Sequence, residues 1–231
     1  MFSIGFRSSM VIQFDSVYVA LDSKDILSNI SFSVLEGGKV ALVGKSGAGK
    51  SSILYVLLGL LIPTAGEVKF NGTKVDFRSI DSLRSSVSYI GQEPVLGDAE
   101  TVRDALMLPF CFKENKHLRP DEAAMKETLS LLDLPADIMD SSVSDISGGE
   151  KQRVALCRGL LQKKRIFLLD EVTSALDKES SRAVMKLLSQ KQYTFLSVSH
   201  HDEWIAGCDT VIELSNGEIS SIKTGAENGN N

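Results

Sequence analysis

One segment constrains the fold of this chain more than any other. Residues 44–51 read Gly-Lys-Ser-Gly-Ala-Gly-Lys-Ser and fit the pattern G-x-x-x-x-G-K-[ST]. A short apolar run, 39–43, precedes them, and 50–61 has the length and apolar density of a buried helix. A glycine-rich loop between a strand and a helix can wrap its backbone N–H groups around phosphate. A chance glycine turn is the weaker interpretation, because the Lys-Ser pair also stands in register.

Two side chains of this loop carry the predicted chemistry. Lys50 would place its charge between the β- and γ-phosphates of a nucleotide, and the Ser51 hydroxyl is a candidate Mg²⁺ ligand. The candidate ATP-binding residues are Gly44, Lys45, Ser46, Gly47, Ala48, Gly49, Lys50, Ser51 and Ser52.

A second motif follows an apolar run. Residues 166–169 are apolar and are succeeded by Asp170 and Glu171. A carboxylate that ends a buried strand needs a charged partner, and Mg²⁺ is a candidate partner for Asp170. The alternative is an acidic helix cap, which the phosphate loop upstream disfavours.

A third motif, Ile146-Ser147-Gly148-Gly149-Glu150, precedes a helix predicted over 149–162. A serine hydroxyl, two small residues and a helix N-terminus together form an anion site. On its own the motif indicates no more than a well-capped helix.

The order and spacing of these motifs resemble the ATP-binding-cassette (ABC) ATPases from about Val11 to Ile222. That family usually has Leu-Ser-Gly-Gly-Gln where this chain has Ile-Ser-Gly-Gly-Glu. The resemblance implies that residues 147–150 close on ATP held by a second copy, giving a head-to-tail homodimer in the ATP-bound state. It also implies that Glu171 polarises the attacking water.

Three further residues match the family by position alone. Gln92 resembles the glutamine that reaches Mg²⁺ and water, which makes Ser51, Gln92 and Asp170 the predicted Mg²⁺ set. His200 resembles the histidine that contacts the γ-phosphate. His201 is adjacent, and we choose His200 because it directly follows Ser199. Asp177 resembles the loop that crosses the dimer interface.

The predicted fold is α/β, a P-loop NTPase core with a RecA-like parallel sheet and helices. An N-terminal antiparallel β subdomain uses strands at 11–21 and 30–35, and an α-helical subdomain is inserted at about 99–150. We expect one domain over 10–224 with flexible tails at 1–9 and 225–231, and Met10 is a candidate start.

One position departs from the family. An aromatic side chain often stacks on adenine about two dozen residues before the phosphate loop, and here that position is Leu21. Tyr18 lies three residues away, which in a strand predicts the opposite face. Adenine binding is therefore expected to be weaker, purely apolar or less selective.

The composition limits the classes of partner that this chain is expected to bind. The formal net charge of −5 disfavours a nucleic-acid partner, and the three separated cysteines indicate neither a disulfide framework nor a zinc site. The apolar run 53–63, about eleven residues, is too short to span a bilayer. A membrane role would then require a separate polytopic permease, with this chain peripheral at the cytoplasmic face of the inner membrane.

The leading hypothesis is the ATP-hydrolysing subunit of a bacterial-type ABC transporter. A groove between its lobes, which includes Gln92–Leu96 and the helical lobe, would move a cytoplasmic helix of the permease. The segment 91–96 also resembles small ATPases of metal-export systems, which suggests a metal ion, such as iron, as cargo. The alternative is a soluble ABC ATPase acting on DNA or ribosomes, which the negative charge and the absence of a coiled coil disfavour. A kinase or GTPase would leave Ser-Gly-Gly-Glu without a role, and no Asn-Lys-x-Asp motif is present.

Overall fold

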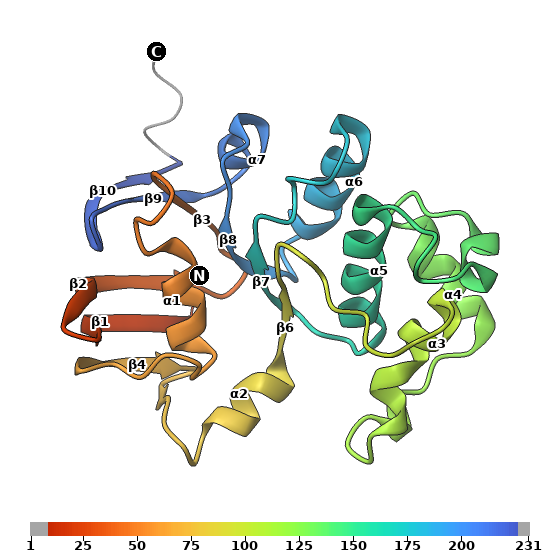
Figure 1. Cartoon of the computed structure of the whole chain (residues 1–231), viewed down its shortest axis with the longest axis horizontal. Helices are drawn as coiled ribbons and strands as arrows, with labels where there is room; N and C mark the ends of the chain where they lie inside the picture. The colour runs from red at the N-terminus through yellow and green to blue at the C-terminus, as the bar shows by residue number, and fades with distance from the viewer. Residues whose placement is uncertain (1–8, 226–231) are drawn as a thin grey trace, which may run out of the picture. The chain divides into compact units, whose positions relative to one another are not determined.

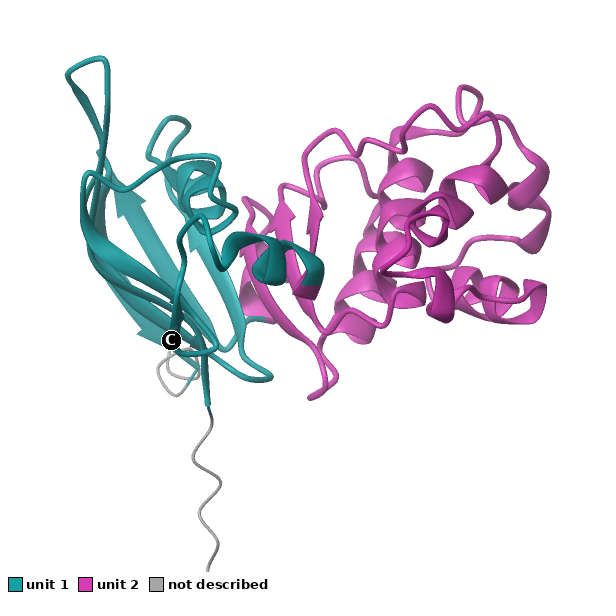
Figure 2. Ribbon diagram, turned by 90° about the horizontal axis from the view of Figure 1, so that it is seen from below, with its two compact units in different colours: residues 1–85, 208–231 teal, residues 86–207 magenta. Residues whose placement is uncertain are grey.

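The computed structural model describes residues 9–225 and divides into two compact units. Unit 1 comprises residues 1–85 and 208–231, and unit 2 comprises residues 86–207 (Figure 2). Most of the two predicted tails, 1–8 and 226–231, lies outside the described residues.

Unit 1 contains the predicted antiparallel sheet, with strand order β2-β1-β4-β5. Its strands are β1 (Met10–Leu21), β2 (Lys24–Leu35), β4 (Ala65–Phe70) and β5 (Thr73–Lys74). The second strand begins earlier than predicted because Asp22 and Ser23, with φ of 47° and 64°, form a two-residue hairpin turn.

Unit 1 also carries the strand and helix that flank the glycine loop (Figure 1). Strand β3 (Lys39–Val43) pairs in parallel with β9 (Thr210–Ser215), and β9 pairs antiparallel with β10 (Glu218–Thr224). Helix α1 (Lys50–Leu57) is shorter than the predicted 50–61. Gly59, with φ of 66°, ends it, and the Leu60 N–H donates to Tyr55 O at 2.8 Å in a Schellman motif.

Helix α2 (Ile80–Ser86) was not predicted from the sequence. It is short and mostly polar, and only Leu83 is fully buried. Arg84 explains part of its placement, because its guanidinium donates two hydrogen bonds of 3.0 and 2.9 Å to the Leu58 carbonyl at the end of α1. This bond pair satisfies a carbonyl that the helix itself leaves unpaired.

Unit 2 is built on three parallel strands in the order β8-β7-β6. They are β6 (Val87–Ile90), β7 (Ile166–Asp170) and β8 (Thr194–Val198), and β7 and β8 are almost completely buried. A parallel sheet needs cover on its faces. Between residues 148 and 206, unit 2 has the helices α5 (Gly148–Leu161), α6 (Lys178–Leu188) and α7 (Asp202–Ala206).

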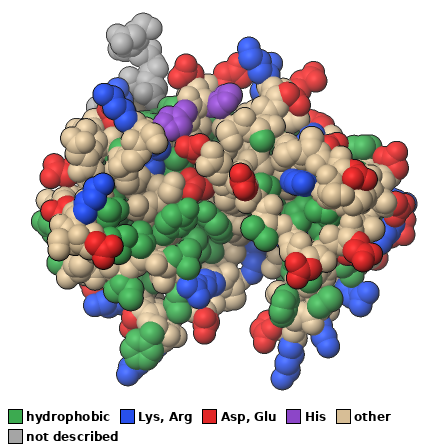
Figure 3. All heavy atoms as spheres, viewed as in Figure 1, with side chains coloured by type: hydrophobic (Ala, Val, Ile, Leu, Met, Phe, Trp, Pro, Cys, Tyr) green, Lys and Arg blue, Asp and Glu red, His purple; other side chains and the backbone are tan. Residues whose placement is uncertain are grey.

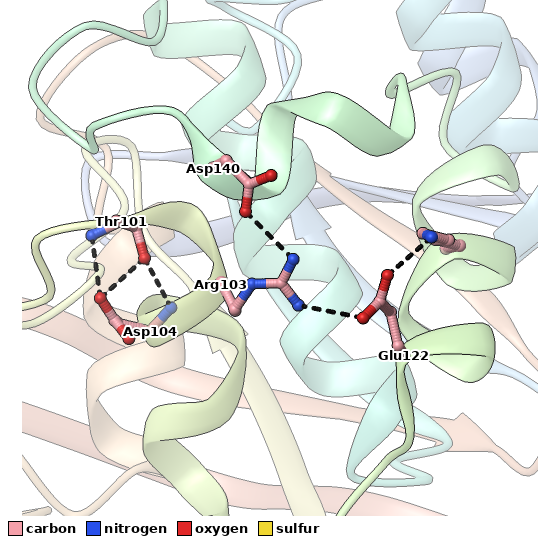
Figure 4. Close-up of polar contacts among 6 residues, drawn as sticks. Thr101, Arg103, Asp104, Glu122 and Asp140 are labelled. Atoms are coloured by element: carbon pink, nitrogen blue, oxygen red, sulfur yellow. Dashed lines mark hydrogen bonds and ion pairs between the residues drawn. The ribbon is translucent and has the colours of Figure 1, made fainter.

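The predicted helical insertion belongs to unit 2. It contains α3 (Val102–Met107), α4 (Glu122–Ser130) and three 3₁₀ turns at 108–111, 116–118 and 136–140. Helix α3 is followed by 3₁₀ geometry from Leu108 because Pro109 cannot donate an α-helical hydrogen bond. Arg103 joins three elements by ion pairs to Asp140 and Glu122, at 3.0 and 3.8 Å (Figure 4).

The surface carries both signs of charge interspersed over the face shown in Figure 3. The three cysteines are free thiols, with Cys111 exposed and Cys157 and Cys208 buried. Among residues 9–225, no helix has both the length and the apolar character needed to cross a bilayer.

Candidate functional site

The glycine loop lies in unit 1 between the end of β3 at Val43 and the start of α1 at Lys50. Gly44 has φ of 140°, and a Cβ there would lie 2.2 Å from the Leu214 carbonyl oxygen of β9. Gly47 also has positive φ, 78°, but a Cβ there would meet no atom within 4 Å. The first glycine is therefore required by packing as well as by backbone conformation.

Lys50 is oriented across the loop. The side chain is only 5% exposed, and its Nζ donates to the carbonyls of Gly44 and Lys45 at 2.8 and 2.9 Å. The ammonium is thereby fixed beside the loop backbone, and its contact with phosphate stays a prediction. Ser51 and Ser52 follow on the first turn of α1, and both are half-buried.

The β9–β10 turn supports the loop from a distant part of the sequence. The Gly217 N–H donates to Ala48 O at 3.2 Å, and the Gly217 carbonyl accepts from the Ser28 N–H at 2.8 Å. The phosphate loop, the closing hairpin and β2 are thus joined within unit 1. The phosphate-loop motif does not indicate that Gly217 contacts the loop. In the sequence, the pair Asn216-Gly217 predicts only a turn.

Strand alternation assigns Leu21 to the face of the β1–β2 hairpin that carries Leu27. Val19 pairs with Leu27, and the Leu27 side chain is 2.7 Å from where a Gly49 Cβ would be. Leu21 is two residues beyond Val19 and shares its face, whereas Tyr18 lies on the other face. Leu21 is 49% exposed at this position.

The paired carboxylates lie at the carboxyl end of β7 in unit 2. Asp170 is 5% exposed and ends the strand. Glu171 follows with φ of 52°, a left-handed conformation that costs a non-glycine residue about 1–3 kcal/mol. Its N–H donates to Val198 O at 3.0 Å, and its Oε1 lies 3.4 Å from His200 Nε2. The structure thus brings Glu171 and His200 together, and His200 rather than His201 is the histidine in contact.

Two buried hydroxyls, which no motif of the sequence indicates, support this pair. Thr173 Oγ1 and Ser199 Oγ are 3.4 Å apart and join the segments that follow β7 and β8. Ser199 Oγ also accepts from the His201 N–H at 3.1 Å. These bonds fix the backbone on both sides of His200.

The Ser-Gly-Gly-Glu motif forms a capping box at the start of α5. Glu150 Oε2 accepts from the Ser147 N–H and hydroxyl at 2.7 Å each, and Ser147 Oγ accepts from the Glu150 N–H at 3.2 Å. The hydrogen bonds from Ser147 hold the pKa of the Glu150 carboxyl below its usual value. A Cβ on Gly149 would lie 2.7 Å from Ala175 O, so this glycine permits close packing on the segment after Glu171.

The two remaining predicted residues have identifiable structural contacts. Asp177 caps α6, accepting from the Ser180 N–H at 2.8 Å and from its hydroxyl at 3.0 Å, and the backbone bond is the main cause of its lowered pKa. Gln92 is exposed after β6, and its carbonyl accepts from Gln152 Nε2 at 3.1 Å.

A strand, a glycine loop and a helix in unit 1, with paired carboxylates ending a parallel strand in unit 2, define a P-loop ATPase. The family model described as ABC transporter matches residues 27–174. The chain belongs to this family and is an ATP-binding cassette ATPase subunit of a transporter.

Individual relatives agree with this assignment. The chain is 36% identical over 214 residues to the probable iron export ATP-binding protein FetA of Escherichia coli (strain K12), covering 90% of this chain and 92% of that protein. It is 30% identical to the energy-coupling factor transporter ATP-binding protein EcfA1 of Ureaplasma parvum, covering 95% and 76%. The dimeric post-hydrolysis structure of the cassette MJ0796 with ADP and Pi superposes with a TM-score of 0.81 at 26% identity, covering 93% and 98%.

Proposed function

We propose that this ATPase works with a separate polytopic membrane permease, at the cytoplasmic face of the inner membrane, and that Glu171 is its catalytic base. The observation that carries the residue assignment is the contact between Glu171 and His200 at 3.4 Å. The left-handed backbone at Glu171 supports it, because such strain is concentrated at functional sites.

The proposed reaction is hydrolysis of the terminal phosphoryl bond of ATP. Glu171 accepts a proton from water, whose oxygen attacks the γ-phosphorus; the bond to the bridging oxygen breaks and leaves ADP and phosphate. Residues 44–52 hold the phosphates, with the Lys50 ammonium on their negative charge. His200 orients Glu171 and contacts the γ-phosphate.

The residues present suit Mg²⁺ by their donor chemistry. Mg²⁺ is usually bound by one or two protein carboxylates together with substrate phosphates and water, so a dedicated cage of acidic side chains is not required. The Ser51 hydroxyl, the Asp170 carboxylate and the Gln92 amide oxygen are hard oxygen donors of this kind. Bound there, the ion would neutralise phosphate charge.

The proposed active form is a head-to-tail homodimer. Ser147, Gly148, Gly149 and Glu150 would close on the ATP of the partner copy, and Asp177 would lie in the loop at the interface. The capped N-terminus of α5 supports an anion contact there.

The permease is proposed to dock beside Gln92–Leu96. A cleft of about 330 Å³ in unit 2 is lined by Tyr89, Pro109 and Phe112 among others, and the Phe112 side chain is 60% exposed. The cleft also carries polar side chains, among them Asn115, Arg158 and Gln162, so an amphipathic permease helix would meet both polar groups and the exposed Phe112 ring there.

Purification from membranes tests this assembly. Tagged Glu171→Gln protein, isolated with ATP from detergent-solubilised membranes, should retain a polytopic protein in near-equal amount. Lys50→Ala is the control, because it should not be trapped by ATP. A ribosomal partner, or a soluble homodimer alone, would contradict the permease assignment.

We also propose a metal ion as the cargo, supported by the name of the relative FetA. Cells that lack the gene should accumulate the exported metal when washed and analysed by elemental mass spectrometry. Unchanged metal content would remove this proposal, and a fall would reverse the direction of transport.

A further inference from the structure

Two side chains of helix α5 donate hydrogen bonds to backbone carbonyls of the segment that follows β6. Gln152 Nε2 donates to Gln92 O at 3.1 Å, and Arg158 Nη2 donates to Val95 O at 2.8 Å. The two donors are six positions apart on the helix, about 9 Å along its axis. Three residues of extended chain cover about 10 Å, so the segment 92–95 runs alongside the helix and is held at both ends.

The Gln152 side chain is poorly explained by stability alone. It is 0% exposed, and its Oε1 has no hydrogen-bond partner among the described residues. A buried acceptor without a partner is costly, and an apolar side chain of similar shape would avoid that cost. What the amide provides is the single bond to the Gln92 carbonyl.

Arg158 makes the second contact from a mostly buried position. Burial lowers the pKa of its guanidinium, although arginine stays protonated at any pH the protein experiences. Its bond to Val95 is therefore made by a charged donor, which is stronger than a neutral one. Val95 itself is 79% exposed, so this end of the segment is accessible at the surface.

The helix that makes both contacts is closely packed at two further places. A Cβ on Gly149 would be 2.7 Å from Ala175 O, and one on Gly159 would be 2.5 Å from Ser88 Oγ of β6. These close approaches hold α5 against the segment that follows Glu171 and against the strand that leads to Gln92. The helix can thus transmit position between these two segments.

We propose that Gln152 and Arg158 are positioning residues that hold Gln92 where it serves hydrolysis. The inference rests on the proposed role of Gln92 and goes beyond it, because neither α5 side chain need touch ATP. Because Arg158 holds the carbonyl of the exposed residue Val95, a contact made at Val95 on the surface would also act on Gln92.

A double-mutant cycle on the full chain tests this role. Gln152→Met and Arg158→Met preserve much of the side-chain shape but lose the donors, and each should lower kcat about tenfold to a hundredfold with ATP affinity little changed. In a Gln92→Ala background the same substitutions should lower kcat no further. Arg158→Lys keeps a charged donor and should recover part of the activity.

Arg153→Met is the matched control. Arg153 lies on the same helix and donates to the carbonyls of Leu132 and Asp133 at 3.3 and 3.1 Å, away from Gln92. Its effect on kcat should be the same with and without Gln92, and thermal unfolding of all variants should show that they are folded.

The outcomes separate the two proposals. If Gln92→Ala leaves kcat unchanged, the role proposed for Gln92 fails. If Gln92→Ala lowers kcat but the Gln152 and Arg158 variants do not, or if their effects add fully to it, only the positioning role fails. Loss of activity in Arg158→Lys equal to that in Arg158→Met would also overturn the role of the hydrogen bond.

Discussion

Two glycines of the phosphate loop separate the effect of backbone conformation from that of packing. Gly44 and Gly47 both have positive φ, but a Cβ on Gly44 would lie 2.2 Å from Leu214 O, whereas one on Gly47 would meet no atom within 4 Å. The obstacle at Gly44 is backbone, so it cannot be relieved by a rotamer change. We therefore expect Gly44→Ala to be markedly more destabilising than Gly47→Ala.

The magnitude follows from terms that the two substitutions share and one that they do not. Both cost about 1–3 kcal/mol for the positive-φ conformation, with Gly44→Ala toward the upper end because φ of 140° is further from the left-handed region than φ of 78°, and both gain about 0.4–1 kcal/mol from the less flexible unfolded chain. Only Gly44→Ala adds overpacking, about 1–3 kcal/mol. The variants should therefore differ by about 2 kcal/mol, or about 4–8 °C in Tm for a chain of this size.

Urea unfolding without nucleotide, followed by circular dichroism, measures this difference directly. The midpoint of Gly44→Ala should fall well below that of Gly47→Ala with a similar m-value. Equal destabilisation by the two substitutions would refute the reasoning, because the contact with β9 would then contribute nothing beyond backbone strain.

Three other substitutions test the candidate site. Glu171→Gln should keep ATP affinity but lower turnover about 100-fold or more, as phosphate release would show, and turnover at the original rate would exclude it as the base. Leu21→Tyr should tighten ATP binding about fivefold for each 1 kcal/mol of base stacking, measured by calorimetry against Tyr18→Leu, which should change little. Glu150→Gln should flatten the acid side of the stability curve. Because the folded pKa of Glu150 is lowered, its carboxylate stabilises above about pH 4.3 and this stabilisation is lost as pH falls through the lowered pKa. An unchanged acid transition in unfolding scans would show that the capping carboxylate is not responsible.

The strands that flank the motifs could be predicted closely because their signals are local. The strands predicted at 39–43 and 166–169 both occur, since each is a short, mainly apolar run with clear boundaries. Helix α1 was predicted too long, because apolar residues continue to Leu61 beyond the capping Gly59. The short α2 was missed because its placement depends on the distant contact of Arg84 with Leu58.

For the candidate site too, local sequence signals could be used, whereas contacts between distant segments could not be predicted. The loop glycines, Asp170 and Glu171 are recognisable from spacing, because each motif combines its residues within a few positions. Thr173 and Ser199 were missed because their bond joins the segments that follow β7 and β8, which are far apart in the sequence. Gln152 had a signal that was not used: it is a polar residue in the buried stripe of a helix, where a partner must be sought.

The residues of the capping box at α5 differ in how far local structure explains them. Ser147 and Glu150 satisfy one another, so the local helix start needs no ligand. Gly149 is different, because its missing side chain permits the close approach to Ala175, in the segment that follows Glu171. The same helix holds the Gln92 and Val95 carbonyls further along. A displacement of α5 would therefore reach the Glu171 segment and the Gln92 segment together, and we propose that this helix, rather than any single residue of the motif, couples the proposed hydrolysis site to a partner bound near Val95.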